Sequence, residues 1–221
     1  MSNFQDKVLE FQLASGQPVH LQRDLTKEEL DFRDNLLREE IRELRDAIVD
    51  NDRVEILDAL CDIKYVNDGT ANMIGFKQND VDFTIKLEDY GYHSKADAIK
   101  AGLSDLEYNN INRRQISRVN SAVTILAYCF GFTLENFKTA LNRVHESNMS
   151  KFCYDIKTAD RTKEFYAKQG INTYVEPKEK KFVVYREGDG KVLKSCDFYP
   201  PYLKDLVDSE LGTGNYGSSG K

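Results

Sequence analysis

The sequence predicts a mainly α-helical protein with a small β-hairpin near its C-terminus. Two observations predict the helices: apolar residues recur at three- and four-residue spacings over long stretches, and polar or glycine-containing breaks separate those stretches. A third observation predicts the hairpin, because from about residue 171 the composition shifts to β-branched and aromatic residues around a turn signal. With 221 residues, of which 40% are hydrophobic and 31% charged, the chain is long enough for one sizeable core.

Helical segments are expected in sequence from the N-terminus. A short amphipathic helix covers residues 2–15, and a long helix over 26–50 begins with a capping box formed by Thr26 and Glu29. The following helix covers 53–75, and the connection before it is so short that the two helices should be antiparallel neighbours. Further helical stretches are expected at 94–101, 115–130, 133–148 and 202–209.

The C-terminal region has β-type composition at Thr173–Val175 and at Lys181–Arg186. Glu187–Gly190 is a turn signal, so we expect Lys191–Lys194 to be the strand that returns along Lys181–Arg186. The last residues, 212–221, are rich in glycine and serine and are expected to be a flexible tail.

Composition excludes several classes of function. The net charge of −6 disfavours nonspecific binding to nucleic acids or anionic membranes, and no apolar run is long enough to span a bilayer. The N-terminus lacks the pattern of a secretory signal, which favours a cytoplasmic protein. The cysteines are widely spaced, without a CxxC pair or nearby histidines, so we expect reduced thiols and no zinc site. They are Cys61, Cys129, Cys153 and Cys196.

Two acidic clusters occupy the two long helices of the expected hairpin. Within each cluster the acids recur at three- and four-residue spacings, so they share one helical face. If the helices pack against each other, several carboxylates converge. These acids are Glu39, Glu40 and Glu43 on the first helix, and Glu55, Asp58 and Asp62 on the second.

Converging carboxylates need compensation. Two of them about 5 Å apart repel by roughly 3 kcal/mol at an effective dielectric constant of 20. Asp58 and Asp62 also lie in an otherwise apolar stretch, Ile56–Val66, and buried acids need partners or a metal ion. Oxygen-only ligands favour a hard cation, Mg²⁺ or Mn²⁺. The alternative interpretation is a pair of solvated acidic helix faces.

A second pair of polar residues occurs far downstream. Asn148 and Lys151 are three residues apart and share a helical face, and an amide beside an ammonium suits phosphate oxygens together with a sugar or base edge. The alternative is a frayed helix end, at which Lys151 interacts favourably with the helix dipole.

Taken in order, the motifs resemble a known family. They are EExxEL at Glu39–Leu44, ExxD at Glu55–Asp58 within DALCDIKYVNDGTA, then HESNMSK, then GKVLK at Gly190–Lys194 followed by two prolines. This ordered set is similar to the MazG-like branch of the all-α nucleoside triphosphate pyrophosphohydrolases. More narrowly, it resembles the phosphoribosyl-ATP pyrophosphohydrolase-like proteins, many of them phage-encoded. The resemblance implies an all-α helical bundle.

The resemblance also implies roles for individual residues. Mg²⁺, or Mn²⁺ in its place, would be bound by the acid set Glu40, Glu43, Glu55 and Asp58, with Asp62 completing the site or orienting a ligand. Glu39 would be a further ligand or support one, and either Glu39 or Glu43 would accept a proton from the attacking water. Asn148 and Lys151 would contact the nucleotide, and Lys151 would stabilise charge on the phosphates. Lys191 and Lys194 either close over the triphosphate or lie on the surface of the hairpin; a surface position is slightly favoured, and Lys194 is kept as a candidate substrate-binding residue.

The chain departs from the family pattern in one respect. Short family members pass almost directly from the DALxD helix to the helix that ends in NMSK, so residues 77–125 are interpreted as an insertion. The expected organisation is a helical catalytic domain over 1–170, a hairpin extension over 171–211 and the tail over 212–221. The family usually builds its site across a dimer or tetramer, so a homodimer or homotetramer is expected, in the host cytoplasm if the protein is phage-encoded.

The expected reaction is the Mg²⁺-dependent hydrolysis of a nucleoside or deoxynucleoside triphosphate to the monophosphate and pyrophosphate. One alternative is a phosphoribosyl-ATP pyrophosphohydrolase. Another is a helical interaction module that has lost its activity. The sequence does not distinguish which base or sugar is preferred.

Overall fold

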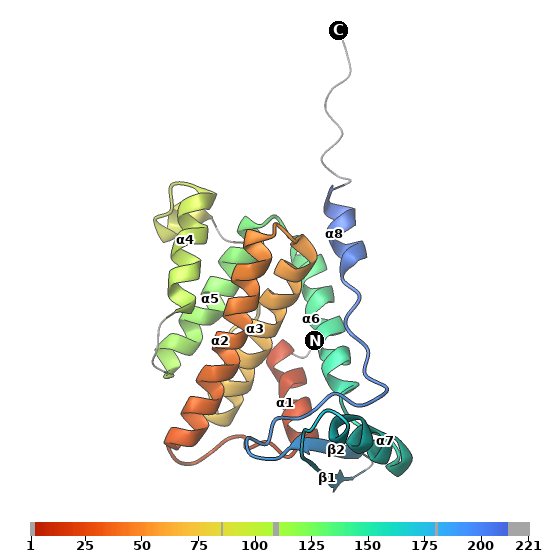
Figure 1. Ribbon diagram of the computed structural model, residues 1–221. Coiled ribbons are helices and arrows are strands. Elements are labelled where there is room, and N and C mark those ends of the chain that lie inside the picture. The colour runs from red at the N-terminus through yellow and green to blue at the C-terminus, as the bar shows by residue number, and fades with distance from the viewer. Residues whose placement is uncertain (1–2, 85, 108–110, 180, 212–221) are drawn as a thin grey trace.

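The structure is a computed structural model that describes residues 3–84, 86–107, 111–179 and 181–211. It is mainly α-helical, with one two-stranded antiparallel sheet near the C-terminus, so the predicted fold class is confirmed. Figure 1 shows a bundle of roughly parallel and antiparallel helices, with the small sheet and one further helix gathered at one end. The expected flexible tail, 212–221, lies outside the described residues.

The centre of the bundle is the predicted helical hairpin, formed by α2 (Lys27–Val49) and α3 (Arg53–Met73). Both components of the capping box that begins α2 are present, between Thr26 and Glu29. The side chain of Asp52 caps α3 by accepting from the first backbone N–H groups of that helix. The tight connection places Asn51 in the left-handed region, with φ of 53°, a conformation that asparagine tolerates well.

Other helices surround α3. α1 and α6 pack on it, α5 packs on another side, and α4 packs on α5. Aromatic rings connect α1 to its neighbours: Phe11 of α1 stacks on Phe152, just after α6, at 5.1 Å and meets Tyr65 of α3 edge-on at 5.8 Å. The bounds are α1 Phe4–Ala14, α4 Lys95–Leu106, α5 Arg113–Cys129 and α6 Leu134–Met149, with a 3₁₀ turn at Leu87–Tyr90.

Residues 77–125, interpreted from the sequence as an insertion, belong to the same core as the rest of the bundle. Val119, Ala122 and Val123 of α5 are buried and lie in the main apolar cluster beside residues of α2 and α3. Removing this segment would therefore expose one side of α3, whatever its origin in the family.

A helix not predicted from the sequence, α7 (Ile156–Ala167), follows the bundle. It buries only the small residues Thr158, Ala159 and Thr162, so its buried face carries no large apolar side chain that would mark it in the sequence. The signal that could have revealed it is the cap, in which the carboxylate of Asp155 accepts from the backbone N–H of Thr158 at 2.8 Å.

The hairpin is present, but its pairing differs from the prediction. β1 (Thr173–Lys178) pairs antiparallel with β2 (Lys181–Arg186), and Tyr174 lies opposite Tyr185 and stacks on it at 5.0 Å. The expected returning segment Lys191–Lys194 runs along the other edge of β2, where an isolated bridge joins Tyr185 to Val192 and the Leu193 backbone N–H donates to the carbonyl of Val184 at 2.8 Å. The predicted last helix is present as α8 (Lys204–Leu211).

All four cysteines are free thiols, with Cys196 exposed and the others buried. Within the described ranges, every helix is too short or too polar to cross a lipid bilayer.

Candidate active site

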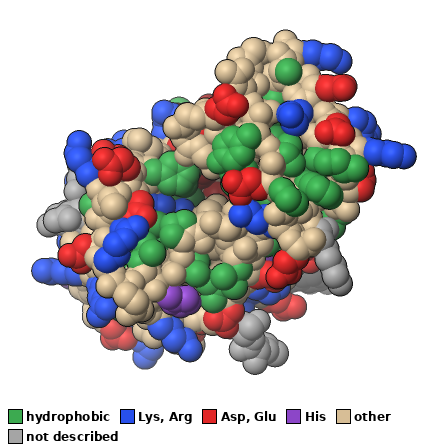
Figure 2. Space-filling view, turned by 90° about the horizontal axis from the view of Figure 1, so that it is seen from below, with side chains coloured by type: hydrophobic (Ala, Val, Ile, Leu, Met, Phe, Trp, Pro, Cys, Tyr) green, Lys and Arg blue, Asp and Glu red, His purple; other side chains and the backbone are tan. Residues whose placement is uncertain are grey.

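A cavity of about 640 Å³ runs along the groove between α2 and α3. Its remaining walls come from α1, the C-terminal end of α6, the hairpin and the segment of residues 187–201, which we call the strap. Figure 2 looks onto this end of the molecule and shows acidic and basic side chains close together around the hollow. Elements far apart in the sequence therefore meet at one site.

The two acidic clusters meet in this cavity, as the helical hairpin predicted. Most of the predicted acids line it, on the facing surfaces of α2 and α3. Glu55 does not line it; its side chain is exposed, one turn before Asp58, whose pKa its charge raises. The lining acids are Glu39, Glu40, Glu43, Asp58 and Asp62.

Burial and mutual repulsion disfavour the ionised form of these acids. Burial raises the pKa of Glu40 to about 8, with further increases from Asp62 and Glu43. Burial likewise raises the pKa of Asp58 to about 7, with Asp62 adding to the effect. Burial raises the pKa of Asp62 to about 6, and the charge of the nearby Lys151 opposes this increase. One oxygen of Asp58, Oδ1, is buried and has no hydrogen-bond partner among the described residues.

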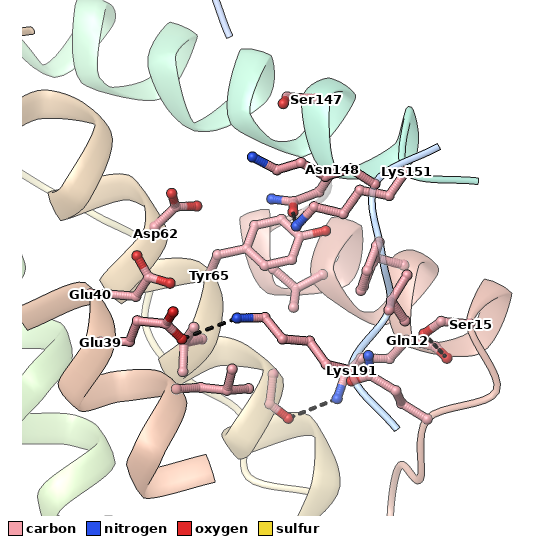
Figure 3. A pocket seen from close by; sticks show the side chains of 18 of the residues that line it. Gln12, Ser15, Glu39, Glu40, Asp62, Tyr65, Ser147, Asn148, Lys151 and Lys191 are labelled. Atoms are coloured by element: carbon pink, nitrogen blue, oxygen red, sulfur yellow. Dashed lines mark hydrogen bonds and ion pairs between the residues drawn. The ribbon is translucent and has the colours of Figure 1, made fainter. Parts of the chain in front are cut away.

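Asn148 and Lys151 face the acids from the end of α6. Figure 3 shows both side chains across the cavity from Glu40 and Asp62. The Lys151 ammonium donates to Oδ1 of Asn148 at 2.5 Å, and the Asn148 amide donates to the carbonyl of Val144 at 3.1 Å. Burial lowers the pKa of Lys151, and Asp62 raises it. The pair predicted from the sequence is therefore placed opposite the carboxylates.

The strap brings two more ammonium groups to the cavity. Lys191 Nζ lies 3.1 Å from Oε2 of Glu39, and Lys194 Nζ lies 4.4 Å from the centre of the Phe198 ring. Both lysines line the cavity, and both also reach solvent, since Lys191 is half-buried and Lys194 is exposed. The local reason is the turn at Asp189, whose carboxylate accepts from the Lys191 backbone N–H at 3.2 Å and directs the chain back over the cavity.

The acid set fits a hard divalent cation in its chemistry, although its present arrangement does not form a coordination site. Within the described part of the chain, no group of three histidine, cysteine, aspartate or glutamate side chains is arranged to hold a metal ion. The donors are nevertheless all oxygens, their pKa values are raised by one another, and Asp58 keeps an unpartnered buried oxygen. A cation would relieve each of these costs.

Sequence reasoning missed the other end of the cavity. There Arg33 of α2, Gln12 and Ser15 of α1, and Tyr174 and Tyr185 of the hairpin line the wall. Arg33 lies seven residues before Glu40 and so shares its face of α2, but the sequence gives no sign that an arginine of this charged helix is buried. Nothing in the local sequence connects the tyrosines to this helix.

The comparisons with known proteins agree with the site. Residues 9–85, which include α2, α3 and all the candidate acids, match the phosphoribosyl-ATP pyrophosphohydrolase family. The chain is also 28% identical, over 94% of its own length and 96% of the relative's, to an uncharacterized protein of Acanthamoeba polyphaga mimivirus. No solved structure matches the chain. The family match supports a nucleotide pyrophosphohydrolase. Residues 9–85 are therefore similar to the phosphoribosyl-ATP pyrophosphohydrolase family, in agreement with the resemblance that the sequence motifs indicated.

Proposed function

We propose that this protein hydrolyses a nucleoside or deoxynucleoside triphosphate to the monophosphate and pyrophosphate, with Mg²⁺ as its cofactor and Mn²⁺ as a substitute. The observation that supports this most is the opposition of charges across one cavity. Carboxylates of α2 and α3 lie on one side, and Asn148, Lys151 and the strap lysines Lys191 and Lys194 lie on the other. Such a site can hold a cation and a polyphosphate together.

The roles follow from position. The cation would be held by Glu40, Glu43, Asp58 and Asp62, which line the cavity, and when bound it neutralises triphosphate charge and lowers the pKa of a coordinated water. Glu55, which lies outside the cavity, is included as a ligand only on the basis of the family resemblance. Lys151 and Asn148 hold the phosphates opposite these acids, and Lys194 supports them from the strap.

In the proposed reaction a water oxygen bonds to the α-phosphorus, and the bond from that phosphorus to the bridging oxygen of the β-phosphate breaks. Pyrophosphate leaves with the electron pair of that bond. The proton released by the water passes to Glu39 or Glu43, both of which line the cavity. Glu39 is available for this role once Lys191 turns from it to the anionic substrate.

The central test is pyrophosphate release by the wild type, Glu40→Gln and Asp58→Asn over a panel of ribo- and deoxyribonucleoside triphosphates with Mg²⁺ or Mn²⁺. Each substitution should lower kcat/KM by about 100-fold or more, because it removes a carboxylate from the charge-neutralising set. Asp46→Asn is the matched control, since Asp46 is an exposed acid of the same helix outside the cavity. Full Mg²⁺-dependent activity in either variant would refute the assignment.

Two alternatives are separated by the same assay. If phosphoribosyl-ATP is hydrolysed faster than every triphosphate of the panel, the protein has the narrower family activity. An inactive interaction module would release no pyrophosphate and would gain no thermal stability from Mg²⁺. The proposed enzyme should be stabilised by Mg²⁺, because a ligand that binds only the folded state raises its stability.

The proposal includes a homodimer or homotetramer, on the basis of the family resemblance. Sedimentation of the purified protein tests it, and a strict monomer with full activity would contradict it.

A further inference from the structure

The end of the cavity away from the acids contains a buried guanidinium. Arg33 is 5% exposed, its Nε donates to the Thr70 hydroxyl at 2.9 Å, and its Nη2 donates to the carbonyl of Val66. Both acceptors are neutral, and no carboxylate of the described residues pairs with Arg33. Burial lowers its pKa to about 10, so it is still charged at neutral pH. Nη1 has no partner among the described residues, which leaves donors for a ligand.

Gly69 of α3 makes room for this guanidinium. A Cβ at position 69 would lie 2.8 Å from Nη2 of Arg33, closer than real Cβ contacts. Glycine inside a helix costs about 1 kcal/mol relative to alanine, and here the space gained is filled by the guanidinium. The same stretch is held from α1, because the Gln12 amide donates to the carbonyl of Gly69 at 2.9 Å. Arg33 is therefore fixed in the cavity wall by both neighbouring helices.

The walls around this group are flat and aromatic. Tyr174 and Tyr185 stack at 5.0 Å with 19° between their planes, and the Tyr185 hydroxyl donates to the carbonyl of Ser15. Phe32 adds a further aromatic side chain to the lining. An acid also lines this end, but Glu176 already pairs with Lys178 at 2.7 Å. Aromatic surfaces beside a fixed hydrogen-bond donor suit a nucleobase.

The spacing between the two ends suits a nucleotide. Seven residues separate Arg33 from Glu40 on α2, and seven separate Asp62 from Gly69 on α3. At 1.5 Å of rise per residue, each interval is about 10 Å along the helix. A triphosphate at the acids and the lysines would thus place its base toward Arg33 and the tyrosines.

We propose that Arg33 determines base specificity by donating to a base edge that carries two acceptors, and that the preferred purine is therefore guanine rather than adenine. This inference rests on the proposed function. Guanine presents O6 and N7 side by side, and both accept from one guanidinium. Adenine presents the N6 amino group, a donor, beside N7, so the guanidinium would face a second donor there.

The test compares kcat/KM for dGTP and dATP in the wild type, Arg33→Met and Gly69→Ala. The wild type should favour dGTP by about 10-fold or more, the range of one bidentate base contact. Arg33→Met should bring the ratio close to one, mainly by lowering turnover of dGTP. Gly69→Ala should also reduce the ratio, because it keeps the positive charge but displaces the guanidinium. Arg42→Met is the control, since Arg42 is an exposed arginine of the same helix outside the cavity.

The outcomes separate this inference from the proposed function. Equal losses with both purines in Arg33→Met would indicate a contact with phosphate or a structural role, and would overturn it. An active wild type without a preference for dGTP would also overturn it while leaving the proposed function intact. No pyrophosphate release from any nucleotide would refute both. Calorimetric binding of GMP and AMP gives a second measurement, in which tighter binding of GMP should be lost in Arg33→Met.

Discussion

Three carboxyl groups in the acidic half of the cavity lower the stability of the fold when they are ionised. Glu40, Asp58 and Asp62 all have pKa values raised chiefly by burial, and like charges nearby add to the shift for Glu40 and Asp58. A functional site often retains such groups at the expense of stability. The residues proposed to bind the cation should therefore destabilise the protein when no cation is present.

Glu40→Gln should stabilise the metal-free protein while abolishing activity. In the folded protein the pKa of Glu40 is about 8, above its ordinary value of 4.5. Ionisation of Glu40 therefore lowers the free energy of unfolding as the pH rises between those two values. The advantage of the variant should be absent near pH 4 and reach about 1–3 kcal/mol by pH 8, since one pKa unit corresponds to about 1.4 kcal/mol. Thermal unfolding across this pH range, in the presence of a chelator, measures it.

Addition of Mg²⁺ should reverse the order of the two proteins at pH 8, because the wild type gains binding energy that the variant lacks. Asp46→Asn provides the baseline, as an exposed position without this burial. A Glu40→Gln protein that is less stable than the wild type at pH 8 without metal would mean that Glu40 contributes a structural contact.

At the residue scale, the acids were predictable and Arg33 was not. Asp58 and Asp62 interrupt an apolar stretch, which by itself indicates carboxylates turned toward the interior. An arginine in a charged amphipathic helix usually lies at the surface, and the burial of Arg33 depends on a glycine of another helix. Such a contact is a property of tertiary packing, which no local pattern contains.

At the scale of elements, the contact between the strap and α2 is weak enough to respond to a ligand. The Lys191–Glu39 ion pair joins it to α2, and both side chains are more than one-third exposed. Exposed pairs of this kind contribute at most about 1 kcal/mol. Lys191 can therefore exchange Glu39 for a phosphate at small cost.

Lys191→Met should raise KM for the triphosphate by about 10-fold, because it removes an ammonium that holds the phosphates. It should change kcat little, because Lys191 is proposed to leave Glu39 once substrate is bound. Its effect on stability should be within about 1 kcal/mol. Steady-state kinetics combined with thermal unfolding measures both effects. Lys178→Met, at the hairpin, serves as the control for a lost ammonium in the same region. A loss of kcat with unchanged KM would instead indicate that Lys191 acts in the chemical step.

Elements were predictable where caps and apolar periodicity coincide. Thr26 with Glu29, followed by regular apolar spacing, located α2 to within a residue at either end. α7 has a cap but buries only small residues, and it was missed. The segment expected to return at 191–194 does run along β2, but it pairs there only through an isolated bridge, and the regular partner of β2 is β1 on its other edge.

At the scale of the whole molecule, one chain supplies every group of the candidate site. The acids come from α2 and α3, the amide–ammonium pair from α6 and the further lysines from the strap, and all of them line one cavity. The family resemblance had implied a site built across subunits. The local sequence cannot predict whether a second subunit contributes to the site, because that depends on which surfaces of the folded chains associate.

A mixing experiment decides whether subunits share the site. Glu40→Gln and Lys151→Met each remove one side of the cavity, and the two sides come from the same chain in this structure. Mixing the two inactive variants, with unfolding and refolding to exchange subunits, should therefore restore no pyrophosphate release. If the sites were shared, hybrid oligomers would contain some intact sites and activity would return. Sedimentation of the mixture, with one variant carrying a fluorescent label, verifies that hybrids form. Within-chain sites should also give a constant specific activity when wild-type oligomers dissociate on dilution.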